Sequence, residues 1–464
     1  MAPSVVSVEP NHTPPADGRT AADSRSRGSA SRQRVGQRTR LPPEIARQAT
    51  AVQLPPTVMA PTKRTCSVRV LRHSDLTTSF VNAWEQLERT AWTPNAYQAP
   101  QFVLAELKHL LPDAQPLFLA VVTNESQATS SSEGLWDEAV DRLVGLTIVS
   151  PTWGNRDLPL PHLEAFRSDY TALDGILLDI EYAESAAEAL FDFIQNSSWH
   201  GLGFEVTHVG SEQANLLQKV ADRRGIEWSE QYRWQRAVMP RSTAQNNYEM
   251  TAISRNRHKK LCRKQRRLKR CGRYEFRIHR EPIDCMHAAE HFLELEAMGW
   301  KGENRSAMTC DRDRRDFYLK MVFDFARAGR IFFTDIVLNG KVIAISCNLL
   351  SEGTAFAFKI GWNSKFGVYS PGLLNAFEKT QAMSSELSDL SLFDSSAQPG
   401  SYLEQIWPDR ISCAKGQFIC SSMGRAAAFA VRQARRLKRQ LKPLRTHTNA
   451  NSRSLPSRQQ ELDA

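Results

Sequence analysis

The chain has 464 residues and carries 60 Lys and Arg against 50 Asp and Glu, a formal net charge of +10. Three segments, residues 1–64, 255–273 and 425–445, together hold a net charge of +25, so the rest of the chain is net −15. This acidic remainder argues against a protein that binds nucleic acid through an overall basic domain. The length allows two or three domains, and 41% hydrophobic residues can build real cores.

The cysteines and the lengths of the apolar runs bear on the cellular compartment in which the protein works. Eight cysteines without a C-x-x-C pair argue against a disulfide scaffold or a zinc ribbon and fit a reducing environment. The sequence has no apolar run of 18 residues, and its N-terminus lacks the apolar core of a secretory signal. We therefore expect a cytoplasmic protein.

The first half of the chain predicts a tail and one folded domain. Residues 1–64, rich in Ser, Thr, Pro, Ala and Arg, are predicted to form a disordered basic tail. In residues 65–240, apolar runs alternate with helical patterns. Strands are predicted at Val68–Leu71, Leu117–Val122, Leu143–Val149, Ile176–Ile180, Gly203–Val209 and Trp234–Met239. Helices are predicted at Leu76–Leu87, Phe102–Leu111, Ala186–Ile194 and Ala214–Arg223.

Residues 241–273 are predicted to be a linker and a basic helix, and residues 274–423 a second domain. Asn339-Gly340 between two apolar runs predicts a hairpin. Ser370 is expected to cap a helix that starts at Pro371. Strands are predicted at Tyr274–Ile278, Ile331–Leu338, Val342–Leu350, Thr354–Ile360 and Leu390–Phe393, helices at Ile283–Met298, Arg314–Ala328 and Pro371–Met383, and closing elements at Tyr402–Trp407 and Ser412–Cys420.

Both halves give a similar element order, so we predict an α+β fold with a mixed sheet, built from two copies of one unit. The order resembles the GNAT acyltransferase superfamily, in particular its tandem-domain CelD-like and BioF-like acetyltransferase branch, a distant relative of the Fem-type peptidyl transferases. The stretches that carry the resemblance are Tyr170–Asp179, Ser254–Gly272, Leu293–Gly302, Phe358–Trp362, Ser370–Leu374 and Asp394.

The resemblance implies transfer of an acyl group, acetyl from acyl-CoA (acetyl-CoA), to an amine of a small or nucleotide-sugar-linked acceptor. It also implies a link to exopolysaccharide or cell-envelope synthesis. A pyrophosphate needs backbone N–H groups at a helix N-terminus, and the strand-to-helix loop offers them. An ordinary capped helix is the alternative. The predicted cofactor-binding residues are Gly361, Ser370, Pro371, Gly372 and Leu373.

Three residues are candidates for the chemistry. Asp394 ends a strand expected to neighbour the strand that carries Lys359, and it could take the amine proton if burial raises its pKa toward neutral. A turn Asp is the alternative. Glu296, on the first helix of the second domain, is the other candidate base or a surface carboxylate. Lys359 could stabilise negative charge or hold an anionic acceptor, or it could simply face outward.

Two basic segments could contact partners. Residues 255–273 hold eleven Lys and Arg and no acid. They could bind phosphates of an acceptor, CoA or RNA, or lie on the acidic body. Arg257 from this segment, with Trp300 and Lys301, is predicted to bind substrate. Gly424–Leu441 is predicted to be a basic amphipathic helix for an anionic membrane surface or a protein partner, or else a solvated tail. Its apolar stripe is Ala430, Ala434, Leu437 and Leu441.

Three other functions compete with the leading one. His287, Glu290 and His291 match the H-x-x-E-H pattern of a zinc peptidase, although the same residues fit surface positions of a helix. We expect no metal. An aminoacyl-tRNA-dependent transferase of the Fem type would use the basic helix to touch RNA. A degenerate, non-catalytic pair of folds would serve as an assembly protein.

Overall fold

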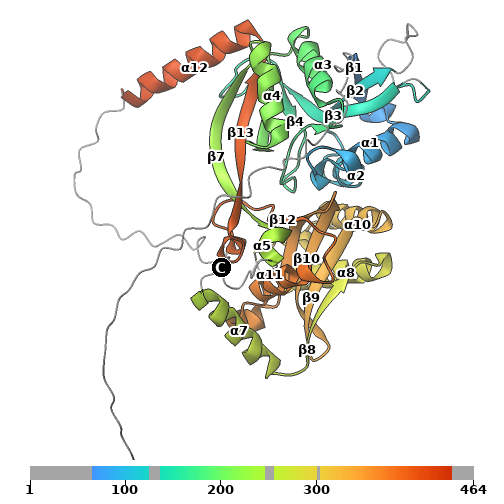
Figure 1. Cartoon of the computed structure of the whole chain (residues 1–464), viewed down its shortest axis with the longest axis vertical. Helices are drawn as coiled ribbons and strands as arrows, with labels where there is room; N and C mark the ends of the chain where they lie inside the picture. Colours follow the sequence, from blue (N-terminus) through green and yellow to red (C-terminus); the bar gives the residue numbers. More distant parts are fainter. Residues whose placement is uncertain are drawn as a thin grey trace, which may run out of the picture. The chain divides into compact units, whose positions relative to one another are not determined.

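The computed structural model describes residues 65–124, 136–139, 141–245, 255–299, 302 and 304–440. Their strands form one mixed 13-stranded sheet (Figure 1). No helix within these ranges is long and apolar enough to cross a membrane. The strand order is β1-β2-β3-β4-β6-β13-β7-β12-β11-β10-β9-β8, with β5 paired to β3.

The first half of the fold runs from β1 to β7. Its strands are β1 (Cys66–Arg72), β2 (Leu117–Asn124), β3 (Asp141–Thr152), β4 (His162–Ala165), β5 (Leu177–Leu178), β6 (Gly201–His208) and β7 (Glu227–Pro240). Its α-helices are α1 (Thr78–Thr90), α2 (Pro100–His109), α3 (Ala183–Gln195) and α4 (Glu212–Arg223), with 3-10 turns at η1 (His73–Asp75) and η2 (Ala96–Gln98).

After α5 (Arg241–Gln245) and α7 (Arg255–Lys269), the second half runs from β8 to β13. Its strands are β8 (Tyr274–His279), β9 (Ile331–Leu338), β10 (Lys341–Ser351), β11 (Thr354–Trp362), β12 (Leu392–Asp394) and β13 (Asp409–Ile419). Its α-helices are α8 (Pro282–Met298), α10 (Arg312–Arg327) and α11 (Pro371–Gln381), with 3-10 turns at η3 (Met308–Cys310), η4 (Ser364–Tyr369), η5 (Ala382–Ser384) and η6 (Tyr402–Gln405). The chain continues into α12 (Ser422–Gln440).

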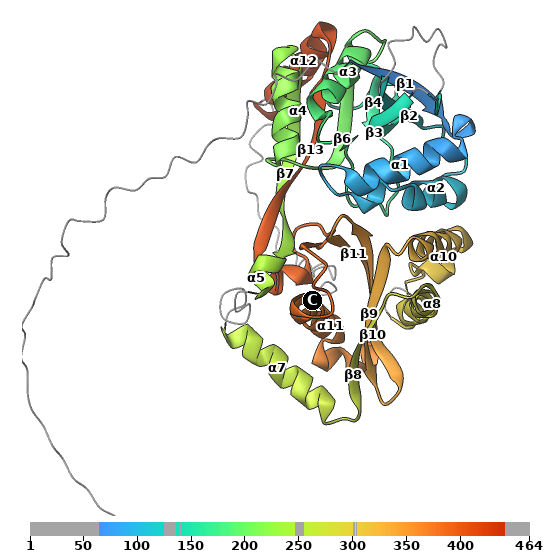
Figure 2. The same cartoon turned by 45° about the vertical axis from the view of Figure 1, so that its right-hand side comes forward.

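Each half repeats the order strand, two helices, a run of antiparallel strands, helix, strand. The predicted α+β fold with a mixed sheet, built from two copies of one unit, is therefore confirmed. The two units exchange strands. The last strand, β13, lies between β6 and β7 of the first half, and β7 pairs with β12 of the second half. Figure 2 shows β7 and β13 running side by side between the two units.

Local expectations succeed where they depend on neighbouring residues. Asn339 and Gly340 have φ angles of 52° and 77°, which is the left-handed backbone of a tight hairpin turn. The predicted strand Trp234–Met239 covers only the second part of β7. The first part consists mainly of polar residues, which give no apolar run, and its pairing with β13 extends the strand. The strand β4 is four residues long and was not predicted.

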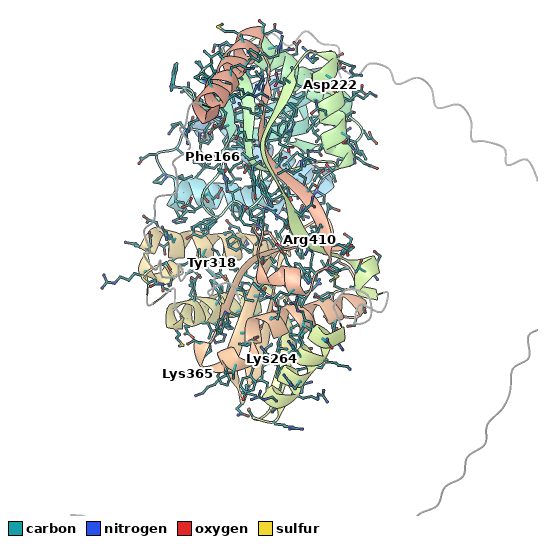
Figure 3. All side chains as sticks on the ribbon, turned by 90° about the vertical axis from the view of Figure 1, so that its left-hand side faces the viewer. Phe166, Asp222, Lys264, Tyr318, Lys365 and Arg410 are labelled. Atoms are coloured by element: carbon teal, nitrogen blue, oxygen red, sulfur yellow. The ribbon has the colours of Figure 1, made fainter. Side chains whose placement is uncertain are left out.

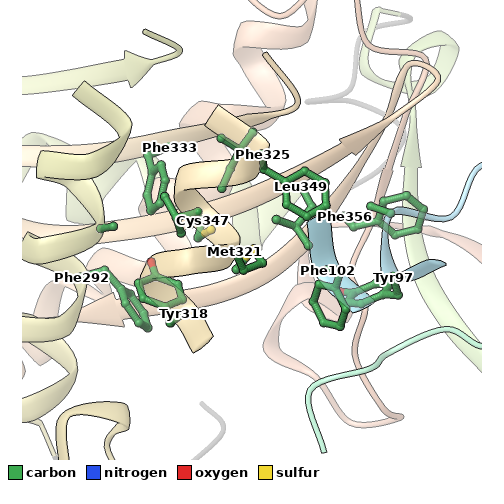
Figure 4. Close-up of a cluster of buried hydrophobic side chains, with 14 of the residues drawn as sticks. Tyr97, Phe102, Phe292, Tyr318, Met321, Phe325, Phe333, Cys347, Leu349 and Phe356 are labelled. Atoms are coloured by element: carbon green, nitrogen blue, oxygen red, sulfur yellow. The ribbon is translucent and has the colours of Figure 1, made fainter. Parts of the chain in front are cut away.

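One apolar cluster joins the two halves. The ring centroid of Tyr97, in the first half, lies 5.1 Å from that of Phe102 and 5.7 Å from that of Phe356 in the second half (Figure 4). The Phe102 ring in turn lies 5.8 Å from that of Phe358. A buried ion pair between Glu88 of α1 and Arg330 adds a charged contact, and the Ser351 hydroxyl donates a 2.6 Å hydrogen bond to the same carboxylate. First-half side chains therefore pack directly against the strands that carry the predicted site.

Candidate active site

The strands β11 and β12 diverge at the place where the candidate residues gather. They pair in parallel only from Thr354 to Phe356, opposite Leu392–Asp394, while β11 continues to Trp362. The register of β10 passes from Lys359 opposite Cys347 to Ala357 opposite Asn348, so Phe358 is the extra residue of a β-bulge. A bulge re-aims the neighbouring side chain and leaves local backbone groups outside the ladder.

Lys359 lies at this opening and contacts the first half. Its ammonium is 4.4 Å from the centroid of the Tyr170 ring, within cation–π range. Tyr170 in turn stacks on Phe317 of α10, at 5.4 Å and an interplanar angle of 26°. The stretch beginning at Tyr170 is thus brought onto the second half, beside the lysine that the sequence selected.

Glu296 belongs to the same neighbourhood. It is buried on α8, and its Oε2 accepts a 2.9 Å hydrogen bond from the backbone N–H of Met308. Burial raises the pKa of the Tyr170 hydroxyl; the Arg314 guanidinium opposes this rise and the Glu296 carboxylate adds to it. Tyr170 therefore contacts Lys359 and lies within the electrostatic influence of Glu296.

A polar cavity of about 610 Å³ adjoins Tyr170. It lies between the end of α2, the 167–170 loop, β6 and the start of α10. Four carboxylates and two guanidinium groups are among its lining side chains, so its charge is net −2. The lining residues are Leu110, Leu111, Arg167, Ser168, Asp169, Tyr170, Glu205, Asp311, Asp313 and Arg314.

Asp394 ends β12, and β12 neighbours the strand of Lys359 as predicted. Its carboxylate is buried 3.7 Å from the Arg236 guanidinium and 3.6 Å from His208 Nε2, and it accepts a 2.6 Å hydrogen bond from the N–H of Ser396. Desolvation alone would raise the pKa of Asp394, but Arg236, His208 and the hydrogen bond outweigh it and lower the pKa. The expected rise toward neutral is wrong.

The loop before α11 places Ser370 at the N-cap and Pro371 at the first helical position, as predicted. Ser370 has a left-handed backbone with φ of 52°, and its hydroxyl accepts a 2.6 Å hydrogen bond from Lys264 Nζ instead of one from a backbone N–H of α11. A Cβ on Gly361 would lie 3.2 Å from Phe292 Cδ2, and one on Gly372 would lie 3.2 Å from Ile360 Cδ1. These two glycines therefore allow close side-chain packing at their positions.

A lysine side chain and the first-turn N–H groups of a helix lie together at the start of α11. The N–H of Leu374 is donated to the Ser370 carbonyl at 3.0 Å, while Gly372 and half-buried Leu373 occupy the first turn, where helix N–H groups point outward. Lys264 of α7 reaches this turn through Ser370 and is labelled in Figure 3. A pyrophosphate fits this combination of cation and N–H groups.

The remaining candidates lie elsewhere. Arg257 is exposed, and its Nη1 donates a 3.0 Å hydrogen bond to the carbonyl of Gln405. Trp300 and Lys301 lie outside the described residues. Buried Pro371 is the first residue of α11.

The zinc-peptidase pattern falls on the surface of α8, where His287, Glu290 and His291 are all exposed. Within the described parts of the chain, no group of three or more His, Cys, Asp and Glu side chains is placed to hold a metal ion.

Glu106 was not selected from the sequence. It is buried on α2, where its Oε1 accepts hydrogen bonds from the hydroxyls of Ser168 and, at 2.8 Å, Thr171. Burial raises its pKa to about 7. The sequence did contain a signal for this buried carboxyl. Glu106 follows Val103 by three residues and Phe102 by four, so it falls on the apolar stripe of the predicted helix.

The comparisons with known proteins agree with this fold. Residues 255–394 match the family model described as an acetyltransferase (GNAT) domain. None of the curated proteins matches the chain.

Similar solved structures include a Bacteroides thetaiotaomicron protein of unknown function, at 11% identity over 74% of this chain and 98% of that one, with a TM-score of 0.47. FemX is 11% identical over 75% and 96% of the two chains, with a TM-score of 0.46. A tandem GNAT protein from the clavulanic acid biosynthesis pathway is 11% identical over 76% and 99%, with a TM-score of 0.36.

The second half therefore contains an acyltransferase-type domain. The family model matches this segment alone, while the order of helices and strands in the first half repeats that of the second.

Proposed function

We propose that this protein is an acyl-CoA-dependent N-acyltransferase. The observation that carries the proposal is the position of Lys359 at the opening between β11 and β12 of a GNAT domain, in contact with Tyr170, which also lines the polar cavity. When bound, acyl-CoA would supply the activated acyl group. Lys264 and the first-turn N–H groups of Gly372 and Leu373 would hold its pyrophosphate.

The chain's own residues would then divide the chemistry. Glu296 accepts a proton from the attacking amine. Lys359, at the bulge, stabilises negative charge that develops on an oxygen, as positioned cations and N–H groups do. Asp394 does not act as the base in this scheme, because Arg236 holds it ionised and lowers its proton affinity. Its role is to fix Arg236, whose Nη2 donates a 2.8 Å hydrogen bond to the Ala172 carbonyl.

The acceptor would be a small polar amine. A cavity with four carboxylates and two arginines favours a cationic amine, while Arg167 and Arg314 could hold an anionic group on the same molecule. A sugar-linked amine, as in exopolysaccharide or cell-envelope synthesis, has both properties when a phosphate is attached. That assignment rests on the CelD-like and BioF-like resemblance.

Binding of the donor can be tested on the full chain. Acetyl-CoA is expected to raise the melting temperature, and Lys264→Met should weaken its affinity about 10-fold, the cost of one charge-assisted hydrogen bond. Lys260→Met is the matched control, since Lys260 is exposed on the same helix one turn earlier. Equal affinity of the two variants would contradict the role of Lys264, and no binding of any acyl-CoA would remove the proposal.

Catalysis is tested by the release of CoA thiol in the presence of a panel of amines. Lys359→Met should lower kcat by about 100-fold, the loss typical of one oxyanion-stabilising group. Glu296→Gln should lower kcat by about 100-fold at neutral pH and less at higher pH, where the amine deprotonates on its own. A rise in KM with an unchanged kcat for either variant would show that the residue does not act in the chemical step.

A second candidate is a transferase that uses aminoacyl-tRNA. The exposed cations of α7 beyond Lys264 favour a longer polyanion, among them Lys260, Arg263, Arg266 and Arg267. Salt-dependent tRNA binding that Arg263→Ala and Arg266→Ala weaken, together with failure to bind acyl-CoA, would favour it. Failure to bind either donor would leave the non-catalytic assembly protein.

A further inference from the structure

The helix α12 is attached to the first half mainly through its arginines. Arg425 donates a 2.6 Å hydrogen bond to the carbonyl of Gly225, and Arg432 lies 3.0 Å from the Glu227 carboxylate. Arg435 pairs with Asp157 and donates a 2.6 Å hydrogen bond to the Arg156 carbonyl. The apolar contribution on this side is small, a buried cluster formed by Ala428 with Leu158 and Ile419.

The apolar stripe of α12 faces away from the body. Phe429 is 55% exposed, Met423 59% and Leu437 57%. Ala430 and Ala434 of the predicted stripe are exposed between them, while Leu441 lies outside the described residues. Several arginines of α12 therefore contact the body of the first half, while its apolar side chains face outward. The helix lies at the periphery of the first half (Figure 1). Exposed apolar stripes of this kind mark interaction surfaces.

An exposed tryptophan lies in the loop that α12 contacts. Trp153 is 84% exposed, and it precedes Arg156 and Asp157, the two residues that Arg435 binds. Arg435 therefore links this loop to α12. We call Trp153 together with the exposed side of α12 the outer face.

The charge of the outer face identifies its occupant. The sequence of α12 contains no acidic residue. The body carboxylates Asp157 and Glu227 are already paired with its arginines, while Arg156 and Arg436 are exposed. A second copy of the chain would bring these cations against one another. An anionic lipid surface would neutralise them and take up the aromatic and aliphatic side chains.

We propose that the outer face docks this protein on an anionic membrane surface. One short helix with small alanines in its stripe gives reversible attachment, because apolar burial and charge attraction are each weak alone. The surface is separate from the proposed acyl-transfer site, so it would recruit the enzyme without altering its chemistry.

The test uses the full chain and vesicles. The protein is co-sedimented with vesicles of phosphatidylcholine alone and of phosphatidylcholine with one quarter phosphatidylglycerol. We expect binding to the anionic vesicles, at least about 10-fold weaker binding to the neutral ones, and loss of binding in high salt. Phe429→Ser with Leu437→Ser should weaken the binding about 10-fold or more, from the apolar area lost. Both side chains are mostly exposed, so the melting temperature should not change.

The matched control is Ile283→Ser, which removes an apolar side chain that is 71% exposed on α8 of the second half. It should bind the anionic vesicles like the parent protein. The proposal is overturned if the parent protein does not sediment with anionic vesicles, or if the double variant binds them equally well. It is also overturned if light scattering shows a dimer that the double variant dissociates, since the outer face would then be a contact between copies.

Discussion

The buried pair of Arg236 and Asp394 gives the sharpest test of the site, because it separates a structural carboxylate from a catalytic base. Asp394→Asn keeps an acceptor for the N–H of Ser396 and removes only the charge. Arg236, which is 1% exposed, would then be a buried cation with no carboxylate beside it. Breaking one partner of a buried pair costs about 3–5 kcal/mol, a large share of the about 5–15 kcal/mol that stabilises a typical domain.

The double variant Arg236→Met with Asp394→Asn should recover most of that loss. It removes both charges and gives up chiefly the hydrogen bond to the Ala172 carbonyl, about 1 kcal/mol. Because the pKa of Asp394 is lowered, the ionised carboxylate makes its full contribution to folding stability above the ordinary pKa of 3.8. That contribution is lost only as the pH falls below this value. The difference between the parent and Asp394→Asn should therefore be constant from pH 5 to pH 8.

The assay is denaturant unfolding followed by fluorescence and circular dichroism, with CoA release measured in parallel. If Glu296 is the base, the double variant is stable and keeps its activity within about 10-fold. A stable double variant with activity lowered by about 100-fold or more would show that Asp394 acts in the chemistry and would refute the assignment. If Asp394→Asn lowered the free energy of unfolding by less than about 1 kcal/mol, the argument that the buried ion pair stabilises the fold would be refuted.

Two further predictions concern buried groups with shifted pKa values. Glu106 has a pKa of about 7 against an ordinary 4.5, so the folded state loses stability as the pH rises through this window. The free energy of unfolding of Glu106→Gln should therefore rise by about 3 kcal/mol relative to that of the parent protein between pH 4.5 and pH 8. A difference in unfolding free energy that stays constant over this range would contradict the burial argument. Lys379, buried against Asn348 and Ser346, has a pKa of about 7 against an ordinary 10.5. The loss of folding stability caused by burying its charged ammonium is therefore complete below pH 7 and decreases toward pH 10.5. The advantage of Lys379→Met in unfolding free energy should shrink by about 3 kcal/mol from pH 7 to pH 9.5, whereas exposed Lys260→Met should show no such change.

Local patterns in the sequence predicted much of the fold. The hairpin at Asn339-Gly340 and most of the helices follow from periodicity and turn chemistry among near neighbours. The basic helix α7 was also predicted, and its two leucines, Leu261 and Leu268, are buried. The environment of Ser370 was not predictable, because Lys264 and the preceding 3-10 turn set its conformation from outside the helix.

The site was predicted only in part for the same reason. Lys359 and Glu296 stand on elements whose order the sequence reveals, so their neighbourhood could be inferred. The electrostatic state of Asp394 could not, since Arg236 and His208 come from β7 and β6 of the other half. Desolvation and a distant counter-charge act in opposite directions on one carboxylate, and only the three-dimensional arrangement decides which is larger.

The strand exchange explains why the segment that matches the GNAT family cannot form this site alone. Residues 255–394 contain Glu296, Lys359 and Asp394, but the ring over Lys359 and the guanidinium beside Asp394 belong to Tyr170 and Arg236 of the first half. The strand β13 then continues the chain into the first-half sheet. Removing the first half would leave Asp394 without its counter-charge and would expose the apolar cluster that both halves share. We therefore regard the opening between β11 and β12 as a composite site, in which the first half sets the electrostatics of residues that the second half supplies.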